Sequence, residues 1–339
     1  RRAYRRREPG RAVIGDERFT AKMLASLPYS PTHAQTRSSA EIFTDMAEPA
    51  PMLRLVQGDV GSGKTMVAAL AMARAAEAGL QSAMMAPTDL LARQHGATLA
   101  PMLEAAGLKM AVLTGRDKAK ERRAILDKMA SGELNVVVGT HALFQEEVVF
   151  HDLGLVVIDE QHRCGVSDRM RMGSKGFAPH VLVMSATPIP RTLALSIHGD
   201  MDLSVLDEKP PGRQPIATAA MPLSRMDEVI DAITAAAKRD ERAYWVCPLI
   251  EDSEAVDLAA VEDRYEELKA RLGKGVELVH GRMSISAREA AMDRFRSGES
   301  FLLVATTVIE VGVNVPEATI MVIEHAERFG LAPLHQLRG

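Results

Sequence analysis

Cysteine, long apolar runs and secretory features are scarce in this chain of 339 residues, and each shortage excludes a class of protein. The two cysteines, Cys164 and Cys247, form no CxxC pair, so neither a disulfide framework nor a zinc knuckle is expected. No stretch approaches the roughly 18 consecutive apolar residues of a membrane-spanning helix. The N-terminal segment RRAYRRREPGR lacks the apolar core of a secretory signal. The sequence therefore predicts a cytoplasmic protein with no membrane partner.

Neither sign of charge is in large excess, which limits how a partner could be held. The chain has 41 Lys and Arg residues against 45 Asp and Glu, a formal net charge of -4, so a polyanion would have to meet local basic patches. Residues 1–11 hold six arginines and one glutamate, typical of a solvated arm or linker, with phosphate contact as the alternative. Because the chain begins at Arg1 rather than Met, we expect a piece of a longer polypeptide.

Short apolar runs alternate with segments of helical composition from Leu53 onward. The runs are apolar at every position, which suits strands buried on both faces and hence a mainly parallel sheet covered by helices. The cluster EKPPGRQPI, with three prolines and one glycine, interrupts the alternation and indicates a linker between two α/β lobes. The expected strands lie at 53–57, 82–86, 110–114, 135–139, 155–159 and 181–185, then at 244–250, 276–280, 301–307 and 319–325.

The strongest motif is GDVGSGKT, which satisfies the phosphate-loop pattern GxxxxGK[ST] between an apolar strand and an alanine-rich helix. In that context, backbone N–H groups of the loop and of the helix N-terminus face the phosphates of a nucleotide. Glycines let the loop bend and approach the anion closely. Lys64 would reach the outer phosphates, and Thr65 would ligate Mg²⁺ through its hydroxyl. The motif predicts a nucleotide site at Gly58, Gly61, Ser62, Gly63, Lys64 and Thr65.

Two further predicted strands end in carboxylate or hydroxyl side chains that could act on a bound nucleotide. VVIDEQH delivers two adjacent carboxylates to the end of a strand, the edge at which open α/β sheets bind ligands. Asp159 could hold Mg²⁺ there, and Glu160 could orient or deprotonate the attacking water, although such a pair without a phosphate loop is usually a helix cap or a solvated turn. VLVMSATPIPRT puts Ser185 and Thr187 at the same edge, where they could sense hydrolysis by exchanging hydrogen bonds with His162.

The ordered set GDVGSGKT, APTDLLARQH, VGTH, DEQH, SATPIPRT and TTVIEVGVNVPEAT resembles the two-lobed motor of superfamily 2 helicases. More narrowly, GDVGSGKT with DEQHR, MSATPIPRTLAL and LHQLRG is similar to the RecG branch-migration helicases of bacteria, from about Phe19 to the end of the chain. With the linker cluster, this resemblance predicts a basic arm at 1–19, a RecA-like first lobe at 20–208, a linker at 209–216 and a RecA-like, C-terminally incomplete second lobe at 217–339.

Roles for individual residues follow from the resemblance. Gln35, in SPTHAQ, would read the adenine edge, since an amide can pair with a donor and an acceptor there. Glu310 and Gly312 would bind the nucleotide from the second lobe. The implied catalytic set is Lys64, Asp159, Glu160, His162 and Gln336. The implied DNA-backbone contacts are Pro87, Thr88, Arg93, Gly139, Thr140, His141, Gly281, Arg282, Thr306 and Thr307.

Three departures from the family's pattern bear on activity. Cys164 stands where the family usually has an aromatic residue after DEQHR, and Asn314 stands where it commonly has Asp. The chain ends at Gly339, inside LHQLRG, before the arginines that form the family's arginine finger, and such a finger contributes about 10³ to 10⁵ in rate. We therefore expect residues 1–339 to bind ATP and to hydrolyse it weakly.

The resemblance implies an ATP- and Mg²⁺-dependent DNA helicase or translocase that remodels branched or duplex DNA, such as stalled forks and Holliday junctions, in recombination and repair. It also implies location in the bacterial nucleoid and a single-stranded-DNA-binding protein as a partner. Two alternatives stay open: the motor of a transcription-repair coupling translocase, and a nucleotide-gated DNA-binding scaffold without productive motion. The basic helix expected at 117–128 is interpreted as a solvated face, with weak DNA-backbone contact as the alternative.

Overall fold

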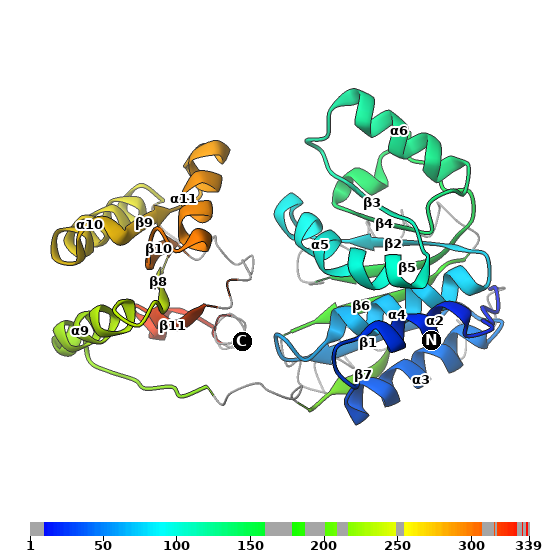
Figure 1. Cartoon of the computed structure of the whole chain (residues 1–339), viewed down its shortest axis with the longest axis horizontal. Helices are drawn as coiled ribbons and strands as arrows, with labels where there is room; N and C mark the ends of the chain where they lie inside the picture. The colour runs from blue at the N-terminus through cyan, green and yellow to red at the C-terminus, as the bar shows by residue number, and fades with distance from the viewer. Residues whose placement is uncertain are drawn as a thin grey trace. The chain divides into compact units, whose positions relative to one another are not determined.

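The computed structural model describes residues 10–159, 178–186, 201–208, 216–248, 254–306, 315, 317–330, 334 and 337. By its internal contacts the chain divides into two compact units, Arg1–Gln214 and Pro215–Arg338 (Figure 1). None of the described helices is long and apolar enough to cross a membrane. The start of the expected basic arm and, apart from Ile216, the expected linker lie outside the described residues.

A seven-stranded sheet forms the centre of the first unit. Its order is β3-β4-β2-β5-β6-β1-β7, and every neighbouring pair is parallel. Six strands coincide within a few residues with the predicted apolar runs, so the predicted parallel α/β class is confirmed. The strands are β1 (Leu53–Gly58), β2 (Gln81–Met85), β3 (Met110–Leu113), β4 (Val136–Gly139), β5 (Leu153–Asp159), β6 (His180–Ser185) and β7 (Asp202–Leu206).

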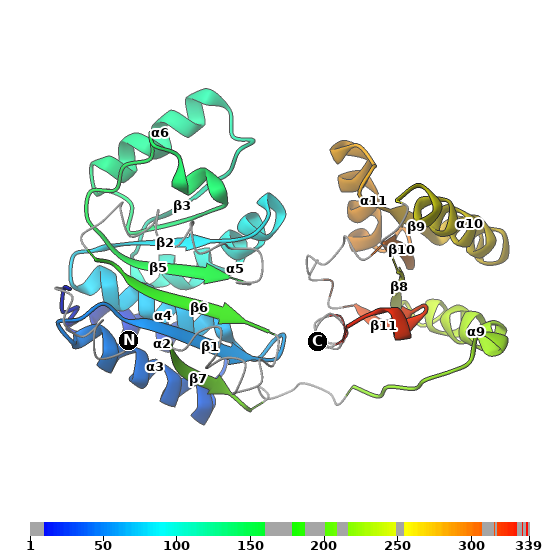
Figure 2. The same cartoon turned by 180° about the vertical axis from the view of Figure 1, so that it is seen from behind.

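Alternate strand residues enter two separate cores, one on each face of this sheet. Leu155 and Val157 of β5 pack on one face, whereas Val156 and Ile158 pack on the other, with side chains of α6. Helices α4 and α5 lie in front of the strands in Figure 1 and behind them in Figure 2. Burial on both faces explains why these strands are apolar at every position. The helices are α2 (Arg18–Ser26), α3 (His33–Ala47), α4 (Lys64–Glu77), α5 (Asp89–Ala106) and α6 (Ala119–Ala130).

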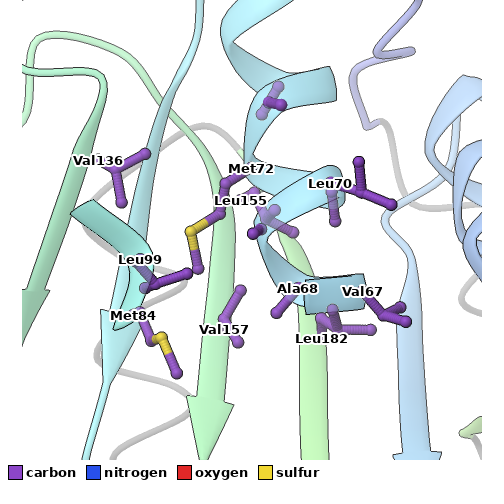
Figure 3. Packing of buried hydrophobic residues seen from close by; sticks show 14 of the residues in the cluster. Val67, Ala68, Leu70, Met72, Met84, Leu99, Val136, Leu155, Val157 and Leu182 are labelled. Carbon is purple, nitrogen blue, oxygen red and sulfur yellow. The ribbon is translucent and has the colours of Figure 1, made fainter. Parts of the chain in front are cut away.

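Helix α4 is buried along almost its whole length. The sheet lies against one side of it, and α2, α3 and α5 pack around the rest. Its many alanines favour the helix and let these neighbours approach closely. Figure 3 shows Val67, Ala68 and Met72 of α4 within the core they share with the sheet. This packing fixes the N-terminus of α4, which begins directly after the GDVGSGKT glycines.

A four-stranded parallel sheet, ordered β11-β8-β10-β9, forms the centre of the second unit. Helices α9 and α10 pack on one face around the fully buried Trp245, and α11 packs on the other through Phe295. Glu324 accepts a hydrogen bond from Trp245 Nε1 at 2.9 Å and forms an ion pair with Arg264 of α10. The elements are α9 (Met226–Ala237), β8 (Arg242–Cys247), α10 (Glu254–Leu272), β9 (Val276–Val279), α11 (Ile285–Ser297), β10 (Leu302–Thr306) and β11 (Ala318–Ile323).

A charged network around a buried arginine joins three elements of the first unit. Arg54 in β1 is only 8% exposed, and its Nε donates to Asp45 Oδ2 of α3 at 2.9 Å. Its Nη1 donates to Glu41 Oε2 of α3 at 3.1 Å and to Ser204 Oγ of β7 at 2.8 Å. The network therefore holds α3 and the edge strand β7 against the strand that leads into the glycine-rich loop.

We predict that Arg54→Ala destabilises the first unit by about 1–3 kcal/mol, because the half-buried carboxylates of Asp45 and Glu41 lose their common donor. Arg37→Ala is the matched control, since Arg37 joins the same helix to Asp207 in an exposed pair at 3.1 Å, and such pairs contribute about 0–1 kcal/mol. Urea unfolding followed by circular dichroism, together with amide hydrogen exchange of β1, measures both losses. Equal losses in the two variants would contradict the prediction.

Candidate functional site

The loop between β1 and α4 depends on glycine at defined positions. Gly61 and Gly63 have φ values of 74° and 90°, in the left-handed region that favours glycine. A Cβ on Gly63 would lie 2.2 Å from Gln35 Nε2, and one on Gly58 would lie 2.5 Å from Ser62 Oγ. The loop is thus closed to larger residues both by its backbone conformation and by its neighbours, as the motif predicts.

Positive charge and hydrogen-bond donors gather at this loop. Lys64 Nζ donates to the carbonyls of Gly58 at 2.7 Å and Asp59 at 2.9 Å, so the ammonium lies across the loop at the start of α4. The hydroxyl of Ser62 is buried and has no hydrogen-bond partner among the described residues. A helix N-terminus, a lysine and a glycine-rich turn form a donor set that fits a phosphate group.

Gln35 supports the loop from the first turn of α3. Its Oε1 accepts from Thr32 N at 2.9 Å while Thr32 Oγ1 accepts from Gln35 N, a capping box that starts the helix. Its Nε2 donates to the Ser62 carbonyl at 2.8 Å, and the side chain is buried. One N–H of the amide is therefore committed to the phosphate loop. The amide has one further N–H and one further acceptor site, and recognition of adenine by these groups stays a prediction.

The acidic strand end shares an edge with the loop. Asp159 closes β5, β5 pairs with β6, and Ser185 at the end of β6 pairs with Gln57 just before the loop. Asp159 is almost buried, and its Oδ2 lies 2.6 Å from Nε2 of His95, a residue of α5. Thr65 is in the first turn of α4. A carboxylate and a hydroxyl oxygen at this edge are ligands that suit Mg²⁺.

The predicted DNA contacts of the first unit follow the other strands of the same edge. Thr88, after β2, caps α5 by accepting from Leu91 N, and Thr140, after β4, donates to Asp89 Oδ1 at 3.3 Å. The side chain of Arg93 is 56% exposed. Pro87 follows β2, Gly139 ends β4, and His141 is exposed at the start of a short 3-10 helix, His141–Phe144. The strand order thus brings all six residues to one side of the site.

Residues after β3 belong to this edge too, and the sequence patterns assigned them no role. Thr114 Oγ1 and Asp117 Oδ1 accept from Arg93 Nη2 at 3.3 and 3.2 Å, and Arg116 forms an ion pair with Asp89 at 3.2 Å. The signal that could have identified them is the polar segment TGRD, which starts at the last residue of the strand expected at 110–114. Polar residues end the other predicted strands of this edge in the same way. His95, which lies within the quoted APTDLLARQH, was missed as well.

In the second unit, three more predicted residues lie at the ends of two adjacent strands, β9 and β10. Gly281 and Arg282 are exposed in the turn after β9, and Arg288 Nη2 donates to the Gly281 carbonyl at 3.1 Å. Burial lowers the pKa of His280 in this turn; the charges of Arg288 and Arg282 lower it further, and Glu262 opposes the shift. Thr306, at the end of β10, is buried with its hydroxyl, so it offers little surface to DNA in this conformation.

Seven of the predicted site residues lie outside the part of the chain that the structure describes, as do Cys164 and Asn314. Most of the described site residues lie at the edge of the first sheet, at the ends of β1, β2, β4, β5 and β6. The seven are Glu160, His162, Thr187, Thr307, Glu310, Gly312 and Gln336.

Comparison with known proteins agrees with this geometry. A family model described as DEAD/DEAH box helicase matches residues 32–195, and one described as helicase conserved C-terminal domain matches residues 224–339. Two parallel-sheet units with a phosphate loop in the first thus define a helicase core. A DEAD-box helicase named Mss116, bound to single-stranded RNA, has this fold with a TM-score of 0.69 at 17% identity, over 96% of this chain and 70% of that one.

Within that class, the chain belongs to the RecG family of ATP-dependent DNA helicases. It is 52% identical over 344 residues to RecG of Escherichia coli K12, which covers 100% of this chain and 50% of that protein. It is 53% identical over 319 residues to RecG of Acidithiobacillus ferridurans, covering 94% and 47%. A solved RecG bound to a three-way DNA junction superposes with a TM-score of 0.82 at 42% identity, over 99% of this chain and 44% of that one. The chain spans about half the length of these relatives.

Gly63→Ala should weaken nucleotide binding at least about tenfold, a change of about 1.4 kcal/mol or more. The added Cβ would displace Gln35 or the loop. Gly79→Ala is the control, because Gly79 has a similar φ of 78° but no atom within 4 Å of the position that a Cβ would take. Both variants carry the left-handed strain of about 1–2 kcal/mol, so a general cost to stability is shared and only Gly63→Ala changes the nucleotide loop. Titration with a fluorescent ATP analogue measures the difference, and unchanged affinity in Gly63→Ala would refute the expectation.

Proposed function

We propose that this chain is the ATP-driven motor of a DNA helicase or translocase that remodels branched DNA, such as stalled forks and Holliday junctions, in recombination and repair. One observation carries the proposal. Along a single edge of the sheet, the predicted nucleotide residues lie at the ends of β5, β6 and β1, and the predicted DNA contacts lie at the ends of the neighbouring strands β2 and β4. The relatives named above, and the one bound to a junction, support the choice of DNA.

In this proposal the nucleotide binds to the glycine-rich loop between β1 and α4 and to the N-terminus of α4. Loop N–H groups, the helix N-terminus and Lys64 bind the phosphates, and Gln35 reads the adenine while it supports the loop. Thr65 and Asp159 fit Mg²⁺, which when bound would neutralise charge on the transferring phosphoryl group. Glu160 orients the attacking water. In the proposal Ser185 and Thr187 respond to hydrolysis through His162, while Glu310, Gly312 and Gln336 act from the second domain.

DNA is held through its backbone. Hydroxyl, guanidinium and main-chain groups after successive strands suit phosphate contact without sequence readout. Arg93 already has acceptors in Thr114 and Asp117, which orient its exposed guanidinium. The proposed contacts are Pro87, Thr88, Arg93, Gly139, Thr140, His141, Gly281, Arg282, Thr306 and Thr307. Of these, Thr306 is buried, so its hydroxyl could reach DNA only after a local rearrangement. Affinity should fall steeply with salt, because each phosphate contact releases counterions.

The proposal extends to organisation and setting. The domains are the basic arm at 1–19, a first RecA-like domain at 20–208, a linker at 209–216 and a second RecA-like domain at 217–339. Kinship with bacterial RecG supports location in the nucleoid and partnership with a single-stranded-DNA-binding protein.

We expect Lys64→Ala to lower ATP turnover by about 10² to 10³, the usual cost of losing one donor to the developing charge. Lys22→Ala, at an exposed position of α2, should leave turnover unchanged. Turnover is measured with Mg²⁺, with EDTA, with linear duplex and with a three-way junction, and the junction should give the largest stimulation. Absence of any DNA stimulation in the full-length protein would favour a nucleotide-gated scaffold over a motor.

A further inference from the structure

His95 connects the two halves of the first unit's functional edge. It belongs to α5, the helix that starts after β2, yet its Nε2 lies 2.6 Å from Oδ2 of Asp159 at the end of β5. Both side chains are nearly buried, at 13% and 11% exposure. An ionised carboxylate can only accept, so Nε2 carries the proton in this contact. A short hydrogen bond to a charged acceptor, shielded from water, is of the strong kind.

The position of the imidazole is set by a tightly packed helix. Thr88 caps the N-terminus of α5. Gly96, the residue after His95, lies so close to β3 that an added Cβ would come within 2.4 Å of Val112 Cγ2. Leu99 and Leu103 are fully buried, and Figure 3 shows Leu99 among the side chains of the sheet, next to Met84. The packing therefore fixes the backbone from which the imidazole projects, and the 2.6 Å contact with Oδ2 then orients the ring and the carboxylate against each other.

This contact selects one oxygen of Asp159 for the cation. A carboxylate at a strand end can rotate about two side-chain bonds, and only hydrogen bonds or a ligand fix its orientation. Among the residues that the structure describes, His95 is the hydrogen-bond partner of Asp159, through Oδ2. With Oδ2 held by the imidazole, Oδ1 is the oxygen left to face a metal ion.

We propose that His95 is a positioning residue that orients Asp159 for Mg²⁺ in the nucleotide site. The proposal rests on the proposed function, in which Asp159 holds that ion. It also gives α5 a second role: the helix that begins at the predicted DNA contact Thr88 carries, two turns later, the group that aligns the metal ligand. Groups that orient metal ligands from outside the coordination sphere typically change metal affinity by about 10- to 100-fold when removed.

The test compares His95→Ala, His95→Gln and Thr98→Ala in the full chain. Gln places an amide N–H near the position of Nε2 and should restore the contact, whereas Thr98 is an exposed residue of the same helix whose hydroxyl bonds only within α5. For each variant the Kd of a fluorescent ATP analogue is measured in EDTA and in saturating Mg²⁺. The Kd in EDTA divided by the Kd in Mg²⁺ gives the factor by which the metal strengthens nucleotide binding, and this ratio does not depend on turnover. Thermal unfolding of each variant is followed in parallel.

We expect His95→Ala to lower this ratio at least about tenfold without changing the Kd in EDTA. His95→Gln should recover most of the ratio, and Thr98→Ala should match the wild type. A ratio that stays at the wild-type value in a folded His95→Ala overturns the inference alone. Loss of affinity in EDTA as well as in Mg²⁺, with no recovery in His95→Gln, overturns it in favour of a purely structural role. A wild type that shows neither metal-dependent binding nor turnover overturns the proposed function and the inference together.

Discussion

The parallel pairing of β5, β6 and β1 is the constraint on which the first unit depends. Because these strands run the same way, their carboxyl ends meet at one edge, and Asp159, Ser185 and the phosphate loop share it. A parallel sheet must also be covered on both faces. Helix α4 meets that need on one face and, by the same placement, presents Lys64 and its N-terminus to the edge. One element therefore serves both the core and the nucleotide site.

The strand order separates the predicted nucleotide residues from the predicted DNA contacts along this edge. β2 and β5 are neighbours, so the groups assigned to nucleic acid and those assigned to the nucleotide are separated only by the boundary between these two strands. The contact between His95 and Asp159 crosses that boundary. A closely packed core holds such a contact in place, because neither α5 nor β5 can shift without disturbing side chains that are fully buried.

Gln35 and Arg93 illustrate how tertiary structure assigns hydrogen bonds that a motif leaves open. An amide near a helix start has four hydrogen-bonding sites, and the fold uses two of them, for the capping box and for the Ser62 carbonyl. Arg93 divides its donors between Thr114 and Asp117 of another strand end while most of its side chain stays exposed. Residue type indicated that these groups could bind a ligand; their neighbours decide how much of that capacity remains.

The sequence by itself determined six of the seven strands of the first sheet and the phosphate loop. Continuous apolar runs specify strands buried on both faces, and Gly61 and Gly63 supply backbone conformations that other residues avoid, so both signals are local. It also indicated which polar residues end those strands. The strand order, the network around Arg54 and the His95–Asp159 contact were decided only by the tertiary structure. His95 and Asp159 are 64 positions apart, and whether such residues meet depends on how whole elements pack, which no short pattern encodes.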